Sequence, residues 1–264
     1  MNKQLQTIVR KDLGAIVQNR QMLAVMLVVP LVLSVLMPLA FVVTLRFLPD
    51  EMGELELLLN SFPAVAGQTT LQRILNLIIN YMLPVLFLMI PIMAASVMSA
   101  GAFVGEKEKQ TLETLLYSPL TLQQVFRAKV MAAFLLGLLV SAVSFVAMVI
   151  AVEGAALLLL KQWIPLGITW LAILLLVGPA LSLIAITLMV RTSAKAQTAM
   201  EAQQRAGFLI LPLVLLLVGQ FTGMMLISFW VLLALGVAAA AVAFLLLRRA
   251  LAGFTYERAL AEQG

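Results

Sequence analysis

The stretch ILNLIINYMLPVLFLMIPIMAASVMSAGAFVG, residues 74–105, contains 32 residues and no charged side chain. An α-helix needs roughly 20 consecutive, mainly apolar residues to cross the hydrocarbon core of a bilayer. Residues 74–105 are therefore long enough for one transmembrane helix with some tilt or overhang. Pro84 and Pro91 should bend this helix, because a proline removes a helical hydrogen bond and crowds the preceding turn.

Four further charge-free stretches have the length of a membrane span: they cover residues 21–45, 130–152, 162–190 and 206–247. The last contains 42 residues, which is too long for one crossing and suits two short ones. Its polar, glycine-bearing break is GQFTG, residues 219–223, where a turn would divide the run. The sequence therefore predicts an all-α integral membrane protein with six transmembrane helices.

The composition excludes several other classes of protein. Hydrophobic residues make up 63% of the chain and charged residues 11%, whereas a soluble domain carries roughly 25% charged residues. Cysteine and histidine are both absent, which excludes disulfides, Cys/His zinc sites and catalysis by a Ser-His pair. No cofactor or metal site is expected in this chain. The net charge of +5 is better explained by the position of the cations in a membrane protein than by binding to nucleic acid. No nucleic-acid partner is expected.

The distribution of Lys and Arg predicts the orientation of the six helices. Alternate segments outside the spans, counted from the N-terminus, contain 14 Lys and Arg residues, against 3 in the remaining segments. Because cations accumulate on the cytoplasmic side, the sequence predicts a multi-pass protein of the cytoplasmic membrane with both termini in the cytoplasm. Residues 46–73 then form the sizeable outer segment, which we expect to be a small cap on the outer surface.

Residues 1–20 are expected to form an amphipathic helix in the membrane interface. One face of this helix would hold Leu5, Ile8, Val9, Leu13 and Ile16, with the cations largely elsewhere. Periodicity alone leaves open an amphipathic leader without a mechanical role. The predicted organisation is thus an interfacial helix at 1–20 and a six-span domain at 21–264.

The cytoplasmic loop between the second and third spans, residues 105–129, is the segment most informative about function. Residues 106–117 are compatible with a helix, and Pro119 ends it. Thr121 and Gln124 match a capping box that starts a second helix at 122–129, which leads into the third span. A partner that binds this segment can move the second span as a lever. On physical grounds alone, acids at a helix N-terminus and leucines resting on the membrane explain the segment equally well.

The same segment resembles the signature of ABC-2 type transporter permeases, in which Glu-x-Glu-x-Gly-Thr-Leu-Glu-x-Leu-Leu-x-x-Pro precedes a lysine that leads into the third span. The matching residues are Glu106, Glu108, Thr111, Leu112, Glu113, Leu115, Leu116, Pro119 and Lys129. Gln110 replaces the glycine that usually precedes the threonine, so this sequence gives no reason to expect a kink there. The six-span plan extends the resemblance less specifically over the whole chain, and it is most similar to the sodium- or drug-efflux branch.

The resemblance implies that the chain is the membrane-spanning permease subunit of an ATP-binding-cassette exporter with a type V-like fold. Such a permease pairs with a second copy of itself or with a sister permease, and two ATPase subunits bind its cytoplasmic coupling helix. ATP and Mg²⁺ would bind in those ATPase chains, while the matching residues from Glu106 to Pro119 would receive their motion. The chain itself has no Gly-x-x-x-x-Gly-Lys-Ser/Thr phosphate loop, so we do not expect it to be an enzyme.

Polar side chains within the spans could line a route for a substrate. The candidates are Asn76, Asn80, Tyr81, Ser96, Ser99 and Gln220. Hydrogen bonding from helix to helix is the alternative role for each of them. All 29 charged residues fall outside the expected spans, which disfavours the alternative of a carrier or channel that works without an ATPase, because such a protein usually carries ionisable groups in the membrane.

Overall fold

The fold is that of a computed structural model, which describes residues 20–47, 68–108, 121–193, 210–221 and 229–253 and the single residues 10, 14, 18, 59, 201, 204 and 208. The described part of the chain is helical and contains no β-strand. Within the expected interfacial helix, residues 10, 14 and 18 are helical, and the rest of 1–19 lies outside the described residues.

The helical elements follow one another with few interruptions. The first span consists of α2 (Arg20–Leu31), the π-helical turn η1 (Val32–Leu36) and α3 (Met37–Phe47). The second consists of α5 (Thr70–Leu77), η3 (Ile78–Met82), α6 (Leu83–Phe87) and α7 (Met89–Glu108). The third consists of α9 (Leu122–Ala155) and η4 (Ala156–Leu160), and the fourth of α10 (Thr169–Ala172), η5 (Ile173–Val177) and α11 (Gly178–Ser193). They are followed by α13 (Leu211–Phe221) and α14 (Phe229–Gly253).

Five helices of the described part are long and apolar enough to cross a membrane: Met26–Phe47, Thr70–Val104, Gln123–Leu160, Thr169–Val190 and Phe229–Ala250. The run at 206–247 was expected to supply two spans, and α14 is one of them. The other would contain α13, whose 11 residues cover about 16 Å at 1.5 Å per residue, which is shorter than a crossing, so the sixth span stays a prediction. Helix α13 continues through Gly219 and Gln220 to Phe221, so the expected turn does not begin at Gly219. Residues 222–228 lie outside the described part of the chain.

The third span is longer than the sequence predicted. The charge-free run covers 130–152, whereas α9 and η4 continue as one helical rod from Leu122 to Leu160. Three charged residues outside the charge-free run, Arg127, Lys129 and Glu153, therefore belong to this rod. A charge-free run ends at the first charged residue, whereas a helix can continue past it, because its backbone hydrogen bonds do not depend on the charge of the side chain.

The fourth span is shorter than predicted. Its charge-free run begins at Gln162, but the helix begins at Thr169, and residues 161–168 form a non-helical connection. Lys161 starts this connection in the left-handed conformation with φ of 53°, which ends the helix of the third span and redirects the chain.

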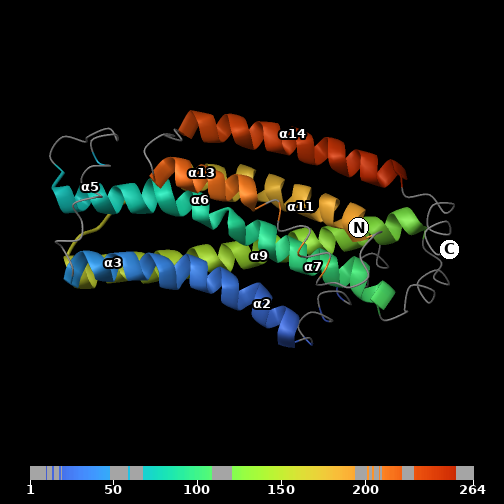
Figure 1. Cartoon of the computed structure of the whole chain (residues 1–264), viewed down its shortest axis with the longest axis horizontal. Coiled ribbons are helices and arrows are strands. Elements are labelled where there is room, and N and C mark those ends of the chain that lie inside the picture. The colour runs from blue at the N-terminus through green and yellow to red at the C-terminus, as the bar shows by residue number, and fades with distance from the viewer. Residues whose placement is uncertain are drawn as a thin grey trace.

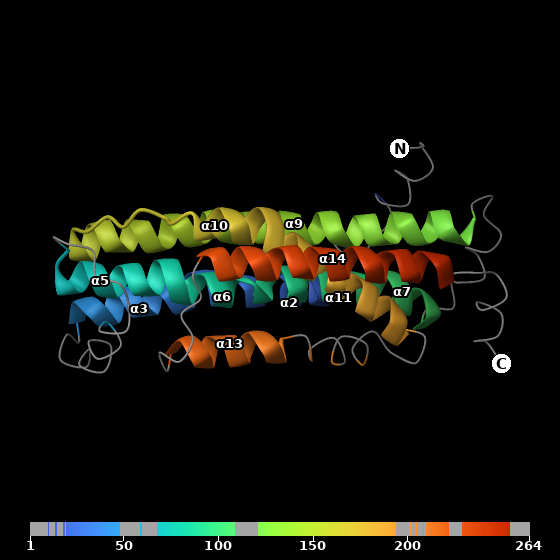
Figure 2. The same cartoon turned by 90° about the horizontal axis from the view of Figure 1, so that it is seen from above.

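The helices run nearly along the long axis of the molecule (Figure 1). The C-terminal ends of α7, α11 and α14 and the N-terminal end of α9 share one end of the bundle, which we call the coupling end (Figures 1 and 2). The C-terminal end of α3 and the N-terminal end of α5 share the opposite end, whereas α14 begins farther inside the bundle (Figures 1 and 2).

The second span is the centre of the bundle. Its most apolar window is 89% buried inside the chain, against 28% for the first span and 17% for α14. Helix α7 packs against α9 and α11, and α2 packs against α7 and α9. A helix that is surrounded by other helices must be apolar on every side, which explains why residues 74–105 contain no charge.

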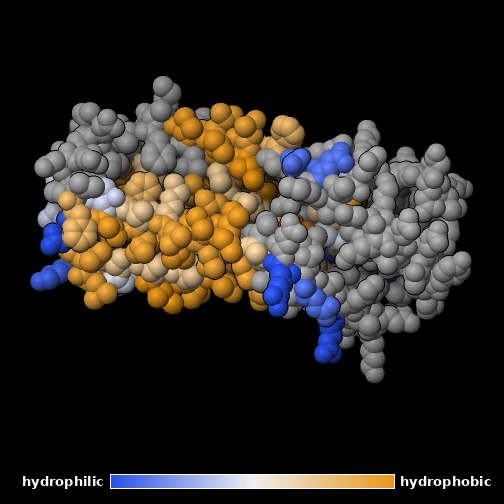
Figure 3. All heavy atoms as spheres, turned by 60° about the horizontal axis from the view of Figure 1, so that its bottom comes forward, coloured by the Kyte–Doolittle hydropathy of each residue, from blue (hydrophilic) through white to orange (hydrophobic). Residues whose placement is uncertain are grey.

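The outer surface of the bundle carries a broad hydrophobic band with hydrophilic residues at both of its ends on the face drawn in Figure 3. Several large apolar side chains are exposed on the bundle: Leu139 and Ile150 of α9 are 61% and 69% exposed, and Leu175 of η5 is 75% exposed. Water solvates a continuous apolar surface of this kind poorly, whereas lipid chains solvate it well. The protein is therefore a multi-pass membrane protein.

Candidate functional site

The coupling end contains the end of the second span. Helix α7 continues as one helix to Glu108, past the end of the apolar window at Val104. Glu106 and Glu108 belong to its last turn, and their side chains lie outside the described residues. The other six predicted coupling residues also lie outside the described residues: Thr111, Leu112, Glu113, Leu115, Leu116 and Pro119. The coupling role of all eight stays a prediction.

The chain enters the third span through a capping box, as the sequence predicted. The backbone N–H of Gln124 donates to the Thr121 hydroxyl at 3.3 Å, and the backbone N–H of Thr121 donates to Gln124 Oε1 at 3.1 Å. These side-chain bonds supplement the bond from the N–H of Gln124 to the carbonyl of Thr121 at 2.9 Å, at a helix start where the first N–H groups have no carbonyl four residues earlier in the helix. The start of α9 is thus fixed at Leu122, directly after the predicted coupling segment.

Lys129, the lysine of the sequence signature, lies between the second and third spans. Its side chain is 3% exposed, and its Nζ donates a hydrogen bond to the backbone carbonyl of Ala102 in α7. The same Nζ lies 5.5 Å from the centre of the Phe103 ring, within the range of a cation–π interaction. Because lysine is almost never fully buried without a partner, this side chain connects the two helices.

Asn80 is the centre of a hydrogen-bonded cluster near the opposite end of the bundle. Its Nδ2 donates to Asn76 Oδ1 at 2.7 Å and to the carbonyl of Pro165 at 3.1 Å, and its Oδ1 accepts from the N–H of Gly167 at 2.7 Å. The amide therefore fixes the 161–168 connection against the second span. A role of Asn76 and Asn80 in lining a pathway stays a prediction, and the observed bonds are those of a packing contact.

Trp170 supplies a hydrogen-bond donor at a point where the backbone hydrogen bonds of the second span are interrupted. In the π-helical turn η3 the N–H of Leu83 donates to the carbonyl of Ile78, so it is not used by Ile79. The next residue is Pro84, which has no N–H. The carbonyl of Ile79 therefore lacks a donor in its own helix, and Trp170 Nε1 donates to it at 3.1 Å. A side chain of the fourth span thus satisfies an acceptor of the second.

The remaining predicted pathway residues occupy several different environments. Ser99 is fully buried and donates to the carbonyl of Ala95 in its own helix at 2.7 Å, so it does not join two helices. Ser96 is 4% exposed, and its hydroxyl has no protein partner. Tyr81 is half-buried against the apolar core, and Gln220 belongs to α13 with its side chain outside the described residues. Their role in a pathway stays a prediction.

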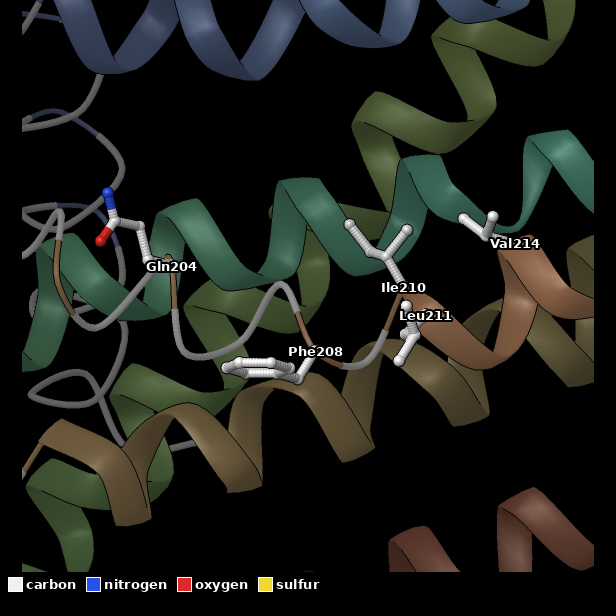
Figure 4. A pocket seen from close by; sticks show the side chains of 5 residues that line it. All are labelled: Gln204, Phe208, Ile210, Leu211 and Val214. Atoms are coloured by element: carbon white, nitrogen blue, oxygen red, sulfur yellow. The ribbon is translucent and has the colours of Figure 1, made fainter.

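A hollow of about 280 Å³ lies where the chain leads into α13 (Figure 4). It is lined by Gln204, Phe208, Ile210, Leu211 and Val214. Four of the five side chains are apolar, and Phe208 is 76% exposed. The hollow brings none of the predicted site residues together, and its lining suits an apolar group rather than an ion.

Sequence reasoning missed several polar contacts at the end of the bundle opposite the coupling end. Thr69 and Gln72 form a capping box at the start of α5, which the Thr-x-x-Gln pattern could have revealed as it did at Thr121. Gln72 also donates to Gln162 Oε1 at 2.9 Å. The role of Trp170 had no sequence signal, because its partner is a backbone carbonyl 91 residues away.

Comparison with known families agrees with this geometry. A family model described as "ABC-2 family transporter protein" matches residues 51–254, which include the buried second span, the capping box and Lys129. No curated protein gives a significant match. Because the family match extends over most of the chain, this protein belongs to the ABC-2 family of transporter proteins and is a transmembrane permease subunit of an ABC transporter.

Proposed function

We propose that this protein is the permease subunit of an ABC exporter, which moves a substrate out across the membrane with energy from ATP that separate ATPase chains hydrolyse. Membership in the ABC-2 family supports the transporter class and an ATPase partner. ATP and Mg²⁺ bind in that partner. The ATPase docks on residues 106–119, where acidic side chains offer charge-assisted hydrogen bonds to a basic surface.

The observation that carries this proposal is the course of the second span. It lies at the centre of the bundle, and α7 leaves that centre as an unbroken helix that ends with Glu106 and Glu108 beyond the apolar window. A force applied at this end therefore reaches the most buried helix of the protein. A segment attached to a peripheral helix would move mainly lipid-facing surface.

The arrangement of the helices supports six crossings. Helix α13 lies beside α6 and η3, and α14 packs against α11. A crossing that contains α13 would bring the number of crossings to six. With six crossings, both termini lie on the cytoplasmic side of the cell membrane, as the Lys and Arg distribution predicts. Two copies, or this chain and a sister permease, assemble with two ATPases.

Charge reversal at the end of α7 tests the docking role. In a cell that expresses this chain with its ATPase, the double substitution Glu106→Lys and Glu108→Lys should abolish co-purification of the ATPase in mild detergent. The reason is that two charges that would attract a basic surface become repulsive to it. Membrane insertion and the elution volume of the permease should stay unchanged.

A matched control uses two acids of the predicted outer segment. Glu54→Lys with Glu56→Lys makes the same change of net charge at the same spacing, and it should leave the ATPase bound. Normal ATPase binding by the Glu106/Glu108 variant would contradict the docking role. A permease that is always recovered alone, and that transports after reconstitution without any ATPase, would refute the proposed function.

A further inference from the structure

Lys129 is buried in an unusual place for a cation. Among the Lys and Arg side chains that the structure describes, it alone is nearly inaccessible, with 3% exposure, whereas its neighbour Arg127 is exposed. A charged group within an apolar helix bundle costs free energy unless hydrogen bonds or paired charges compensate for it. Burial of this cation is by itself weak evidence for a stabilising role.

The contacts of Lys129 lie close to the predicted coupling segment on both sides. On α9, Lys129 follows the capping box at Thr121 by two turns. On α7, the acceptor is Ala102 and the aromatic contact is Phe103, one turn before Glu106. Phe103 also packs against Phe126 with 5.7 Å between ring centres. The ammonium group therefore joins the two helices from which residues 109–120 extend.

Two further contacts repeat along the same pair of spans. A Cβ added to Gly137 would lie 3.4 Å from the Cβ of Ala95, so the backbones approach closely at this point. Phe145 packs edge-to-face on Phe87, with 6.0 Å between ring centres. We call these three contacts, Lys129–Ala102, Gly137–Ala95 and Phe145–Phe87, the seam.

The spacing of the seam fixes the register of the two helices. Its residues on the third span are eight apart, and those on the second span are seven and eight apart in the opposite direction. The contacts follow one another in opposite directions along the two chains, so the helices are antiparallel and each contact belongs to one defined register. A shift by one turn, about 5.4 Å, would move the ammonium group of Lys129 away from the carbonyl that it binds.

We propose that Lys129 is a positioning residue that prevents the second span from sliding along the third, so that both flanks of the coupling segment move as one rigid body. This inference rests on the proposed function, because it assigns the part of the permease that receives the motion of the ATPase. The close approach at Gly137 brings the helices together, and the hydrogen bond from Lys129 to the carbonyl of Ala102 selects the register. The lever is then a pair of helices.

Disulfide cross-linking tests the register, since the chain contains no native cysteine. The pair Ala95→Cys with Gly137→Cys should cross-link readily, because the Cβ separation of 3.4 Å is close to the roughly 3.5–4.5 Å of disulfides. Pairing Ala95→Cys with Ala133→Cys or with Ser141→Cys, one turn to either side, should give little product. Adding Lys129→Met should produce the shifted cross-links or slow the matched one.

The native register should also persist during the ATPase cycle. In the complex with its ATPase, the matched pair should cross-link equally in nucleotide-free protein and in protein trapped with ATP and vanadate. Shifted cross-links that appear in the trapped state of the native Lys129 chain would refute the rigid pair. Identical cross-linking patterns with Lys129 and with Lys129→Met would refute the role of the lysine.

The effect on coupling is measured with the full complex. Lys129→Met should keep the ATPase bound but reduce the stimulation of ATP hydrolysis by the permease about fivefold or more, which is the lower end of typical coupling effects. Lys129→Arg should retain most of it, because a guanidinium can donate to the same carbonyl and stack on Phe103. The exposed neighbour provides the control, and Arg127→Met should behave as the native protein.

The outcomes separate this inference from the proposed function. If Lys129→Met keeps the ATPase bound and stimulates ATP hydrolysis as much as the native chain does, the positioning role is overturned. If the native chain binds no ATPase, the proposed function fails, and the cross-linking of the permease alone still decides whether Lys129 sets the register. Should Lys129→Met not insert, Lys129→Ala, which likewise has no donor for the carbonyl of Ala102, takes its place in every measurement.

Discussion

At the scale of single residues, the polar groups of this protein are used mainly to satisfy backbone atoms that the helices cannot satisfy themselves. Trp170 donates to the carbonyl of Ile79, and Asn80 binds the N–H of Gly167 and the carbonyl of Pro165. In the interior of a membrane protein no water is available to replace these partners. Losing one of these side chains should therefore cost about as much as leaving a buried polar group without a partner.

We predict that Trp170→Phe lowers the stability of the protein by about 1–3 kcal/mol, the cost of a buried polar group without a partner. The ring remains, so the packing on Phe87 and Phe145, whose centres lie 5.5 and 5.2 Å from that of Trp170, is largely kept. Thermal denaturation in detergent, followed by the loss of the monodisperse peak in size-exclusion chromatography, measures the change.

Two further variants of this experiment identify the cause. Trp163 is 68% exposed, and Trp163→Phe should leave the melting temperature unchanged. Pro84→Ala provides the N–H that the carbonyl of Ile79 lacks, so Trp170→Phe should cost less in that background than in the native one. An equal cost in both backgrounds would show that the Trp170 hydrogen bond has no energetic importance.

At the scale of the elements, four of the spans contain a π-helical turn at which the helix continues without a non-helical break. These turns are η1 in the first span, η3 in the second, η4 in the third and η5 in the fourth. A π-helical turn contains one extra residue, so it releases a carbonyl from the regular pattern and shifts the face that the following residues present. The adjoining residue must tolerate the displaced backbone, as Gly178 does after η5.

Gly178→Ala should destabilise the protein by about 1–3 kcal/mol, because an added Cβ would lie 2.8 Å from the carbonyl oxygen of Ile173, a backbone atom that cannot rotate away. The matched control is Gly154→Ala in α9, where an added Cβ meets no atom within 4 Å. That substitution should stabilise the protein by about 0.5–1 kcal/mol, since alanine has the higher helix propensity. Melting curves of both variants in one detergent decide; a loss of stability at Gly154 and none at Gly178 would contradict this account.

At the scale of the whole molecule, burial and charge divide the bundle into distinct parts. The second span is almost entirely enclosed, and the first span, third span and α14 present apolar surface outward. Cations gather at the coupling end, where Arg248 and Arg249 of α14 are exposed. The positive-inside rule therefore predicts that the coupling end faces the cytoplasm.

Single cysteines in the cysteine-free chain should reveal this orientation. Trp163→Cys lies in the exposed connection between the third and fourth spans, and Arg248→Cys lies at the coupling end. A membrane-impermeant maleimide added to intact cells should label only the first, and both should react after the membrane is permeabilised. Labelling of Arg248→Cys in intact cells would show that the coupling end faces outward, where no cytoplasmic ATPase can bind it.

The sequence could predict those features whose cause is local. The absence of charge over 74–105 reflects burial on all sides, and the pattern of Thr121 and Gln124 specifies a helix start, because both partners lie within one turn of the chain. The family resemblance, confirmed by the family match, likewise rests on a contiguous segment. The boundaries of the third and fourth spans could not be predicted, because a hydropathy run ends at the first charge, whereas a helix continues for as long as its backbone hydrogen bonds are made.

The amino-acid sequence by itself thus determined that this protein is a helical membrane protein of the ABC-2 class, since hydropathy, charge and a short motif depend on neighbouring residues alone. The tertiary structure decided which polar residues act as packing contacts and which cation is buried. Lys129 meets Ala102 across 27 residues, and Trp170 meets Ile79 across 91. These partners are backbone atoms, which every residue possesses, so no pattern of side chains in the sequence predicts them. Only the register of the packed helices brings them together.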